Sequence, residues 1–219
     1  MPNIHELIQV LIFVRLILIE YLIPLPESIS FEVGASMLLQ GLTAVALTKQ
    51  AYCIKPGDTV LIHAAAGGTG LLLVQLAKFY GATVIGTTST PAKAEVAKAA
   101  GVDHIILYTQ EDVATRVMEL TQNVGVDAVY DGVGKSTFDV SLKCLKRLGF
   151  MLSFGNASGK VDDVPIMKLV PKAIRLMRPS LYEFLKNKQD FDECIILMFR
   201  LIRSDTRIAK SHSRRENLI

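Results

Sequence analysis

Cysteine is scarce in this sequence. Its 219 residues include only Cys53, Cys144 and Cys194, an odd number placed far apart. This spacing offers neither a redox pair nor the paired cysteines of a structural zinc site, so it excludes both kinds of centre. We therefore expect a reducing compartment and a cytoplasmic location, with the three cysteines on helical segments as buried apolar fillers.

A large excess of one charge is also missing. Lys and Arg number 24 and Asp and Glu number 21, which gives a net charge of +3. Residues 203–219 hold five of the basic and two of the acidic residues, so residues 1–202 are neutral. Charge alone therefore gives no support for a nucleic-acid-binding face. We expect residues 203–219 to form a basic, disordered tail.

The sequence has no unbroken apolar run of membrane-spanning length at its start. Residues 4–23 are rich in Ile, Leu and Val, but they include Glu6, Arg15 and Glu20, and Arg15 would lie near the middle of a span. The basic start and small-residue cleavage site of a secretory signal are also missing. The pattern argues against a membrane anchor and indicates that residues 1–23 are a separate apolar segment, either packed on protein or foreign to the fold.

Apolar residues, by contrast, are abundant. Hydrophobic residues make up 50% of the sequence and charged residues 21%, which excludes a disordered or fibrous chain and supplies a core that folds without disulfides. Residues 24–28 (Pro-Leu-Pro-Glu-Ser) predict a linker. The apolar spacing then predicts a helix over residues 31–52 with Ser30 as its N-cap, followed by a turn at residues 56–58.

From residue 59 onward, strand patterns alternate with helix patterns. The predicted strands cover residues 59–63, 82–86, 104–107, 126–130 and 149–154. The predicted helices cover residues 69–80, 91–100, 111–122 and 135–146. Further on we expect a helix near residues 165–172, a short strand near 174–177 and helices after 180. This alternation indicates an α/β fold with a doubly wound parallel sheet, whose almost continuously apolar strands are buried on both faces.

A glycine-rich turn follows the first of these strands. Residues 64–70 read Ala-Ala-Ala-Gly-Gly-Thr-Gly, close to the pattern G-x-G-x-x-G with Ala65 in the first glycine position. Gly67 and Gly68 would let backbone N–H groups approach a diphosphate, and Gly70 would let the helix pack closely on the strand. The strand, turn, helix and second strand are the context that a dinucleotide-binding Rossmann domain requires, with an empty glycine turn as the alternative.

The end of the second strand indicates which dinucleotide would bind. An NAD site places Asp or Glu there to hold the ribose hydroxyls, whereas this sequence has no acid before Glu95. Ser89, Thr90 and Lys93 suit a 2′-phosphate because they supply hydrogen bonds and a positive charge. We therefore predict NADP, although Lys93 could instead be a solvated helix residue. Tyr108, at the end of the third strand, would cover the adenine or pack in the ordinary way.

Two further strand ends carry small residues. Residues 130–134 read Tyr-Asp-Gly-Val-Gly, and residues 154–159 read Phe-Gly-Asn-Ala-Ser-Gly. Ligands of open α/β sheets bind at the carboxyl ends of the strands, where small residues would let a ribose and a nicotinamide lie against the backbone. Each segment could also be an ordinary turn. The candidate residues at this end are Gly132, Phe154, Gly155, Asn156, Ala157 and Ser158.

Together these segments resemble the quinone oxidoreductases of the zeta-crystallin branch of the medium-chain dehydrogenase/reductase superfamily. The resemblance covers about residues 24–202 and is carried by segments 39–44, 63–70, 130–134, 153–159 and 178–181. It implies a zinc-free, NADPH-dependent reductase, usually a homodimer, that transfers hydride to quinones or related electrophilic alkenes. No catalytic side chain and no metal are then needed, because the cofactor carries the chemistry.

The resemblance also assigns positions to roles. Gly68 and Thr69 would face the diphosphate, and Thr43 would approach the nicotinamide ring. Residues 89–93 and Tyr108 would hold the 2′-phosphate end of the adenosine. Gly132 and residues 154–158 would line the nicotinamide end. Two other polar residues have weaker claims: we expect His63 to be packed rather than catalytic, and Asp131 to orient a ribose or its own turn.

The sequence departs from the family at both ends. Family members carry a GroES-like catalytic domain before this one, and a returning strand and helix after it, and neither is recognisable here. We therefore expect NADPH-dependent quinone reduction that is impaired in this chain, since one wall of the cleft would be missing. The alternatives are a non-catalytic NADPH- or RNA-binding module, because some relatives bind AU-rich RNA, and a membrane-tethered reductase fragment.

Overall fold

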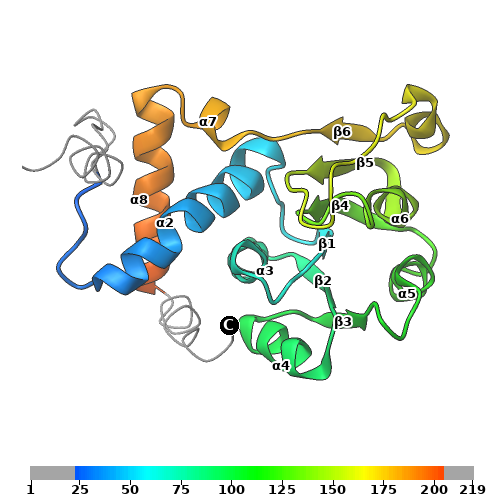
Figure 1. Cartoon of the computed structure of the whole chain (residues 1–219), viewed down its shortest axis with the longest axis horizontal. Helices are drawn as coiled ribbons and strands as arrows, with labels where there is room; N and C mark the ends of the chain where they lie inside the picture. Colours follow the sequence, from blue (N-terminus) through cyan, green and yellow to red (C-terminus); the bar gives the residue numbers. More distant parts are fainter. Residues whose placement is uncertain (1–22, 205–219) are drawn as a thin grey trace, which may run out of the picture.

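A six-stranded parallel sheet forms the centre of the molecule (Figure 1). The computed structural model describes residues 23–204. The strand order is β3-β2-β1-β4-β5-β6, the doubly wound order of dinucleotide-binding domains, and every neighbouring pair is parallel. The predicted fold class is therefore confirmed. The strands are β1 (Thr59–Ile62), β2 (Thr83–Thr88), β3 (His104–Leu107), β4 (Val126–Asp131), β5 (Leu145–Ser153) and β6 (Arg175–Met177).

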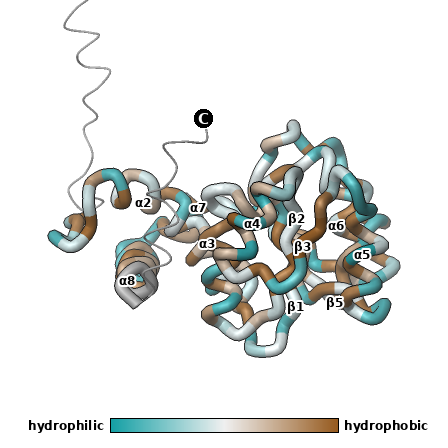
Figure 2. The backbone as a smooth tube through the Cα atoms, turned by 90° about the horizontal axis from the view of Figure 1, so that it is seen from below, coloured by the Kyte–Doolittle hydropathy of each residue, from teal (hydrophilic) through white to brown (hydrophobic). Residues whose placement is uncertain are grey.

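Helices cover both faces of the sheet. The helices are α2 (Phe31–Ala46), η2 (Leu47–Ala51), α3 (Gly68–Phe79), α4 (Pro91–Ala100), α5 (Val113–Leu120), α6 (Phe138–Cys144), η3 (Ile166–Lys172), α7 (Leu181–Phe184) and α8 (Lys188–Ser204). One hydrophobic cluster joins residues of α2, α3, α4 and α8 to the sheet, and the other joins residues of α5 and α6 to its opposite face. In β1, Val60 and Ile62 belong to the first cluster and Leu61 to the second, as expected for a strand buried on both faces. Figure 2 shows hydrophobic stretches of backbone among the strands and the helices that cover them.

The segment before the sheet is the predicted long helix. Ser30 caps α2 by accepting a hydrogen bond from the Val33 N–H at 3.4 Å. With η2, this helix is long and apolar enough to cross a membrane by length and composition alone, but half of its most apolar window is buried. It packs against α3 and α8, as the core helix of a globular domain does (Figure 1).

Most predicted boundaries agree with the structure to within two residues, and two elements differ by more, for visible reasons. The predicted helix over 135–146 is shorter, because Gly134 adopts φ +90° and the next residues turn before α6 begins. The strand predicted over 149–154 begins four residues earlier, because the pairing of β4 with β5 shifts register between Val126 and Ala128. The helix α8 continues to Ser204, and the proposed segments 1–23 and 203–219 lie almost entirely outside the described residues.

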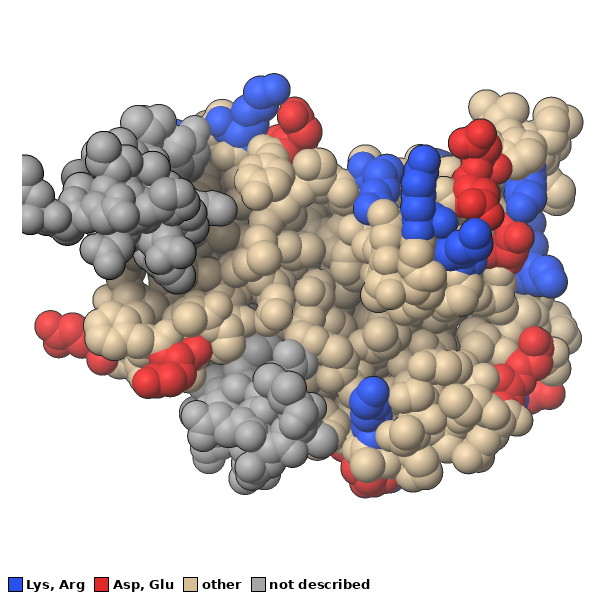
Figure 3. All heavy atoms as spheres, viewed as in Figure 1, with Lys and Arg blue, Asp and Glu red and all other residues tan. Residues whose placement is uncertain are grey.

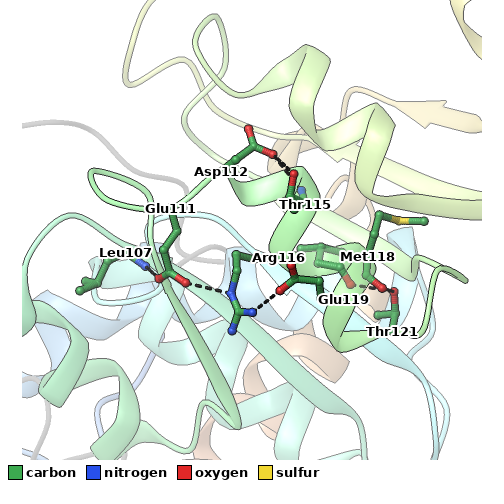
Figure 4. Close-up of polar contacts among 9 residues, drawn as sticks. Leu107, Glu111, Asp112, Thr115, Arg116, Met118, Glu119 and Thr121 are labelled. Carbon is green, nitrogen blue, oxygen red and sulfur yellow. Dashed lines mark hydrogen bonds and ion pairs between the residues drawn. The ribbon is translucent and has the colours of Figure 1, made fainter.

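The connection from β3 to α5 is fixed by polar contacts (Figure 4). Asp112 is the N-cap of α5 and accepts from the Thr115 N–H at 2.8 Å, which holds the pKa of this carboxyl below its ordinary value. Glu111 accepts from the Leu107 N–H at 3.0 Å and pairs with Arg116 at 2.9 Å. These contacts explain why the helix predicted over 111–122 begins only at Val113.

The cysteines divide into two environments. Cys144 and Cys194 are buried on α6 and α8, as predicted, but the expectation for Cys53 is wrong. Cys53 follows the end of η2 in an irregular segment and is exposed. Burial raises the pKa of the Cys144 thiol to about 12 and also raises that of Cys194.

Thiol labelling should separate the three residues. At pH 8 we expect iodoacetamide to modify Cys53 rapidly and to leave Cys144 and Cys194 intact until the protein is unfolded. Burial blocks access to both, and a thiol of pKa about 12 is deprotonated in only about one molecule in ten thousand at this pH. Peptide mass spectrometry before and after guanidinium treatment measures this, with Cys53→Ser as the control. Fast labelling of Cys144 in the folded protein would contradict the assignment.

Candidate functional site

The glycine turn presents free backbone donors. The helix α3 begins at Gly68, and its N-cap Gly67 supplies no capping side chain. The turn closes with a 2.8 Å bond from the Gly67 N–H to the Ala64 carbonyl. Among residues 23–204, no protein acceptor bonds the N–H groups of Gly68, Thr69 or Gly70. Free donors and the positive end of the helix dipole together suit an anion.

The predicted glycines are required by close packing. A methyl group on Gly70 would lie 2.3 Å from the Ala64 carbonyl oxygen, and one on Gly68 would lie 2.9 Å from the side chain of Gln40. Ala65, in the first glycine position of the motif, packs against Gly86, where a Cβ would lie only 2.8 Å away. Glycine at these positions therefore lets the turn approach α2 and β2 closely, as the glycines of this motif do in dinucleotide-binding domains.

The residues predicted for the 2′-phosphate lie together at the start of α4. Thr90 is the N-cap, and its hydroxyl accepts from the Lys93 N–H at 3.3 Å. The Ser89 carbonyl accepts from the Thr109 hydroxyl at 3.1 Å, which joins this loop to the one after β3. The Lys93 side chain is exposed and has no ion-pair partner within the described part of the chain. Tyr108, also exposed, directly follows the neighbouring strand β3.

The loops after β4 and β5 lie against each other. The Phe154 ring packs on Gly132, where a Cβ would lie 2.8 Å from the ring. A Cβ on Gly155 would lie 2.3 Å from the Gly132 carbonyl oxygen, which in turn accepts from the Ala157 N–H at 3.2 Å. The Ser158 hydroxyl donates to the Val133 carbonyl at 2.9 Å and is therefore used to join the loops.

A cavity of about 620 Å³ opens between α2, α3 and the segment before α7. It brings the predicted Thr43 and Thr69 together, although the Thr43 hydroxyl already donates to the Leu39 carbonyl at 2.7 Å. Gln40 also lines it, and within residues 23–204 its buried Oε1 has no hydrogen-bond partner. Sequence reasoning gave Gln40 no role, because its contact with Gly68 joins segments far apart in the chain. Figure 3 shows an uncharged surface between α2 and the sheet, with Lys and Arg gathered over β5.

Arg178 is a second residue of this cavity for which the sequence suggested no role. Its guanidinium donates to the carbonyls of Ser153 and Gly155 at 2.8 and 3.2 Å, and it lies 3.4 Å from the Asn156 side-chain oxygen. Arg178 therefore fixes the loop after β5 from outside the sheet. The segment 178–181 that carried part of the family resemblance lines the cavity together with Tyr182.

His63 and Asp131 are both buried beneath this edge, so neither faces the cavity. The expectation that His63 is packed is confirmed. Asp131 orients its own turn by accepting from the N–H groups of Val133 and Gly134 at 2.8 and 3.0 Å. Within the described residues, no three His, Cys, Asp or Glu side chains are grouped as metal ligands would be. The zinc-free expectation stays a prediction.

The comparisons agree with this geometry. Quinone oxidoreductase 1 of Escherichia coli is 44% identical over 181 residues, which cover 82% of this chain and 55% of the relative. A 2-haloacrylate reductase of a Burkholderia species is 39% identical over 209 residues, covering 92% of this chain and 63% of the relative. This chain therefore spans little more than half the length of these curated relatives, and the resemblance to quinone oxidoreductases is confirmed.

Solved structures give the same result. A quinone oxidoreductase of Pseudomonas syringae superposes with a TM-score of 0.82 at 39% identity, covering 88% of this chain and 65% of that one. The E. coli quinone oxidoreductase complexed with NADPH has a TM-score of 0.80 at 39% identity, covering 87% of this chain and 63% of that one. A family model described as zinc-binding dehydrogenase matches residues 68–200, more than half of the chain, so the chain belongs to that dehydrogenase family.

Proposed function

We propose that this chain binds NADP(H) at the carboxyl edge of its sheet and serves NADPH-dependent reduction of quinones or related electrophilic alkenes. The observation that carries the proposal is the uncapped N-terminus of α3, whose free N–H groups lie over a turn that only small residues can form. The relative solved with NADPH supports the choice of coenzyme. When bound, the reduced coenzyme supplies the hydride.

The residues of this chain then have positioning roles. The N–H groups of Gly68 and Thr69 hold the diphosphate, the methyl-free backbone at Gly67 admits it, and Gly70 lets α3 begin close against Ala64. Ser89, Thr90 and Lys93 hold the 2′-phosphate, with Tyr108 beside the adenine. The nicotinamide end lies near Thr43 and against the small-residue loops, whose members are Gly132, Phe154, Gly155, Asn156, Ala157 and Ser158.

The partner and location complete the proposal. The outer strand β6 is exposed along its length, and among residues 23–204 no strand pairs with its outer edge, which suits a homodimer. Free cysteines suit a cytoplasmic compartment. RNA binding by the tail at 203–219 concerns residues mostly outside the described part of the chain and stays a prediction.

Replacing Lys93 tests the choice of coenzyme. Lys93→Ala should raise the dissociation constant for NADPH about tenfold and leave that for NADH unchanged, because only NADPH carries the phosphate that the ammonium group would contact. Titration followed by coenzyme fluorescence measures both constants. The matched control is Lys98→Ala, because Lys98 is an exposed lysine in the last turn of the same helix. Equal affinity of the unmodified protein for both coenzymes would remove the 2′-phosphate assignment.

A further inference from the structure

Four polar side chains from four different elements lie buried beneath the carboxyl edge of the sheet. They are His63 after β1, Thr87 in β2, Asp131 at the end of β4 and Ser141 in α6, and none is more than 3% exposed. Buried polar groups are costly unless they are hydrogen-bonded, so their mutual contacts decide whether this arrangement is stable. Here each contacts the next. Together His63, Thr87, Asp131 and Ser141 form one continuous series of hydrogen bonds, which we call the relay.

The hydrogen bonds of the relay run in one direction. The Ala64 N–H donates to the Thr87 hydroxyl at 3.3 Å, which leaves the hydroxyl hydrogen free to donate to His63 Nδ1 at 3.1 Å. At the other end, the Ser141 hydroxyl lies 3.2 Å from Asp131 Oδ2 and 2.8 Å from the Thr137 carbonyl, both of which only accept. Ser141 must therefore accept from His63 Nε2 at 3.0 Å. These contacts assign the proton to Nε2 and leave Nδ1 unprotonated.

At one end the relay holds the glycine turn. Ala64 adopts φ +51°, a left-handed conformation that is strained for a residue with a side chain. Two bonds from the end of β2 hold it there: the Ala64 N–H to the Thr87 hydroxyl, and the Ala65 N–H to the Thr87 carbonyl at 3.0 Å. The direction of the Ala64 carbonyl matters, because it accepts from the Gly67 N–H and lies against Gly70.

At its other end the relay holds the turn after β4. The Asp131 carboxylate accepts from two backbone N–H groups of this turn and from the Thr137 hydroxyl at 2.8 Å. The Asp131 carbonyl accepts from the Phe154 N–H at 2.8 Å, which extends the connection to the loop after β5. The relay thus links the turn proposed for the diphosphate to both loops proposed for the nicotinamide end.

We propose that His63 is a positioning residue for the dinucleotide: neutral and protonated at Nε2, it fixes the glycine turn relative to the loops after β4 and β5. Burial lowers the pKa of His63 and so favours this neutral form. The role rests on the proposed coenzyme function, but it concerns the shape of the site rather than contact with the ligand. Nothing in the relay bonds to Ser89 or Lys93 within the described residues, so the adenosine 2′-phosphate end lies outside its reach.

The test compares a whole coenzyme with a fragment that does not reach the glycine turn. His63→Leu should weaken NADPH binding about tenfold and change the affinity for adenosine 2′-monophosphate less than about twofold. Folding should survive, because Thr87 keeps its bond from Ala64 and Ser141 keeps its carboxylate and carbonyl acceptors. His63→Asn should restore only part of the lost NADPH affinity, since its amide can again bond to Thr87 but ends short of the Nε2 position that bonds to Ser141.

Calorimetry gives the dissociation constants for NADPH, and NMR titration gives those for adenosine 2′-monophosphate, which binds more weakly. His104→Leu, the same change at an exposed position on β3, is the control and should alter neither. If His63→Leu does not fold, Ser141→Ala applies the same test, because it removes the partner of His63 Nε2 and keeps the bond from the Ala64 N–H to Thr87. Unchanged NADPH affinity, or equal losses for both ligands, would overturn the positioning role while leaving the coenzyme function standing. Failure of the unmodified protein to bind NADPH would overturn the proposed function itself and the relay's role with it.

Discussion

Gly70→Ala should abolish tight NADPH binding and lower the free energy of unfolding by about 3 kcal/mol. The added methyl group would lie 2.3 Å from the Ala64 carbonyl oxygen and 3.1 Å from the carbonyl carbons of Ala64 and Ala65. All three are backbone atoms, and the Ala64 oxygen is itself bonded to the Gly67 N–H. Relief would require the glycine turn to move, and the donors proposed for the diphosphate would move with it.

Denaturant unfolding and NADPH titration at low temperature measure the two effects separately. Gly34→Ala is the matched control, since its methyl group would meet only the end of the half-buried Leu25 side chain, at 2.8 Å. That change should leave coenzyme affinity unaltered, because α2 gains a better helix former far from the turn. A Gly70→Ala protein that is folded and binds NADPH as tightly as the unmodified protein would mean that the coenzyme does not use this turn.

The sequence allowed much of the fold to be predicted because its local signals agree with one another. The bounds of α4 are as predicted, since Pro91 stands at the first helical position and Gly101 ends the helix in a left-handed conformation. The central strands β1, β2 and β4 are buried on both faces, so they could be located from hydropathy alone. The glycine turn was recognisable for the same reason: its function needs a particular order of small residues within ten positions.

The features that sequence reasoning missed depend on contacts between distant segments. The contact of Gln40 with Gly68 joins α2 to α3, and the bond of His63 to Ser141 spans 78 residues. No local pattern signals either. His63 was expected to be packed, and it is packed. Yet Ser141 connects it to the Asp131 carboxylate through space, and this supplies the relay that the reasoning lacked.

The largest functional effect should appear when turnover is compared with binding. A polypeptide of these 219 residues should bind NADPH but reduce 1,4-benzoquinone at least about 100-fold more slowly than E. coli quinone oxidoreductase 1. Two apolar side chains of the large cavity are open to water, Leu39 at 68% and Tyr182 at 87% exposure. Hydride transfer needs an acceptor held in place and water kept out, and this cavity wall provides neither on its open side.

Loss of NADPH absorbance at 340 nm measures turnover, and a coenzyme titration on the same sample shows how much of the protein is loaded. The matched control is the homologous 181-residue stretch of the E. coli relative, produced alone. If an open cavity is the cause, that stretch should be as slow as this chain, although every residue in it comes from an active enzyme. A fast E. coli stretch beside a slow chain would place the deficit in residues particular to this sequence. Turnover by this chain within about tenfold of the whole E. coli enzyme would show that residues 1–219 already enclose the reacting groups.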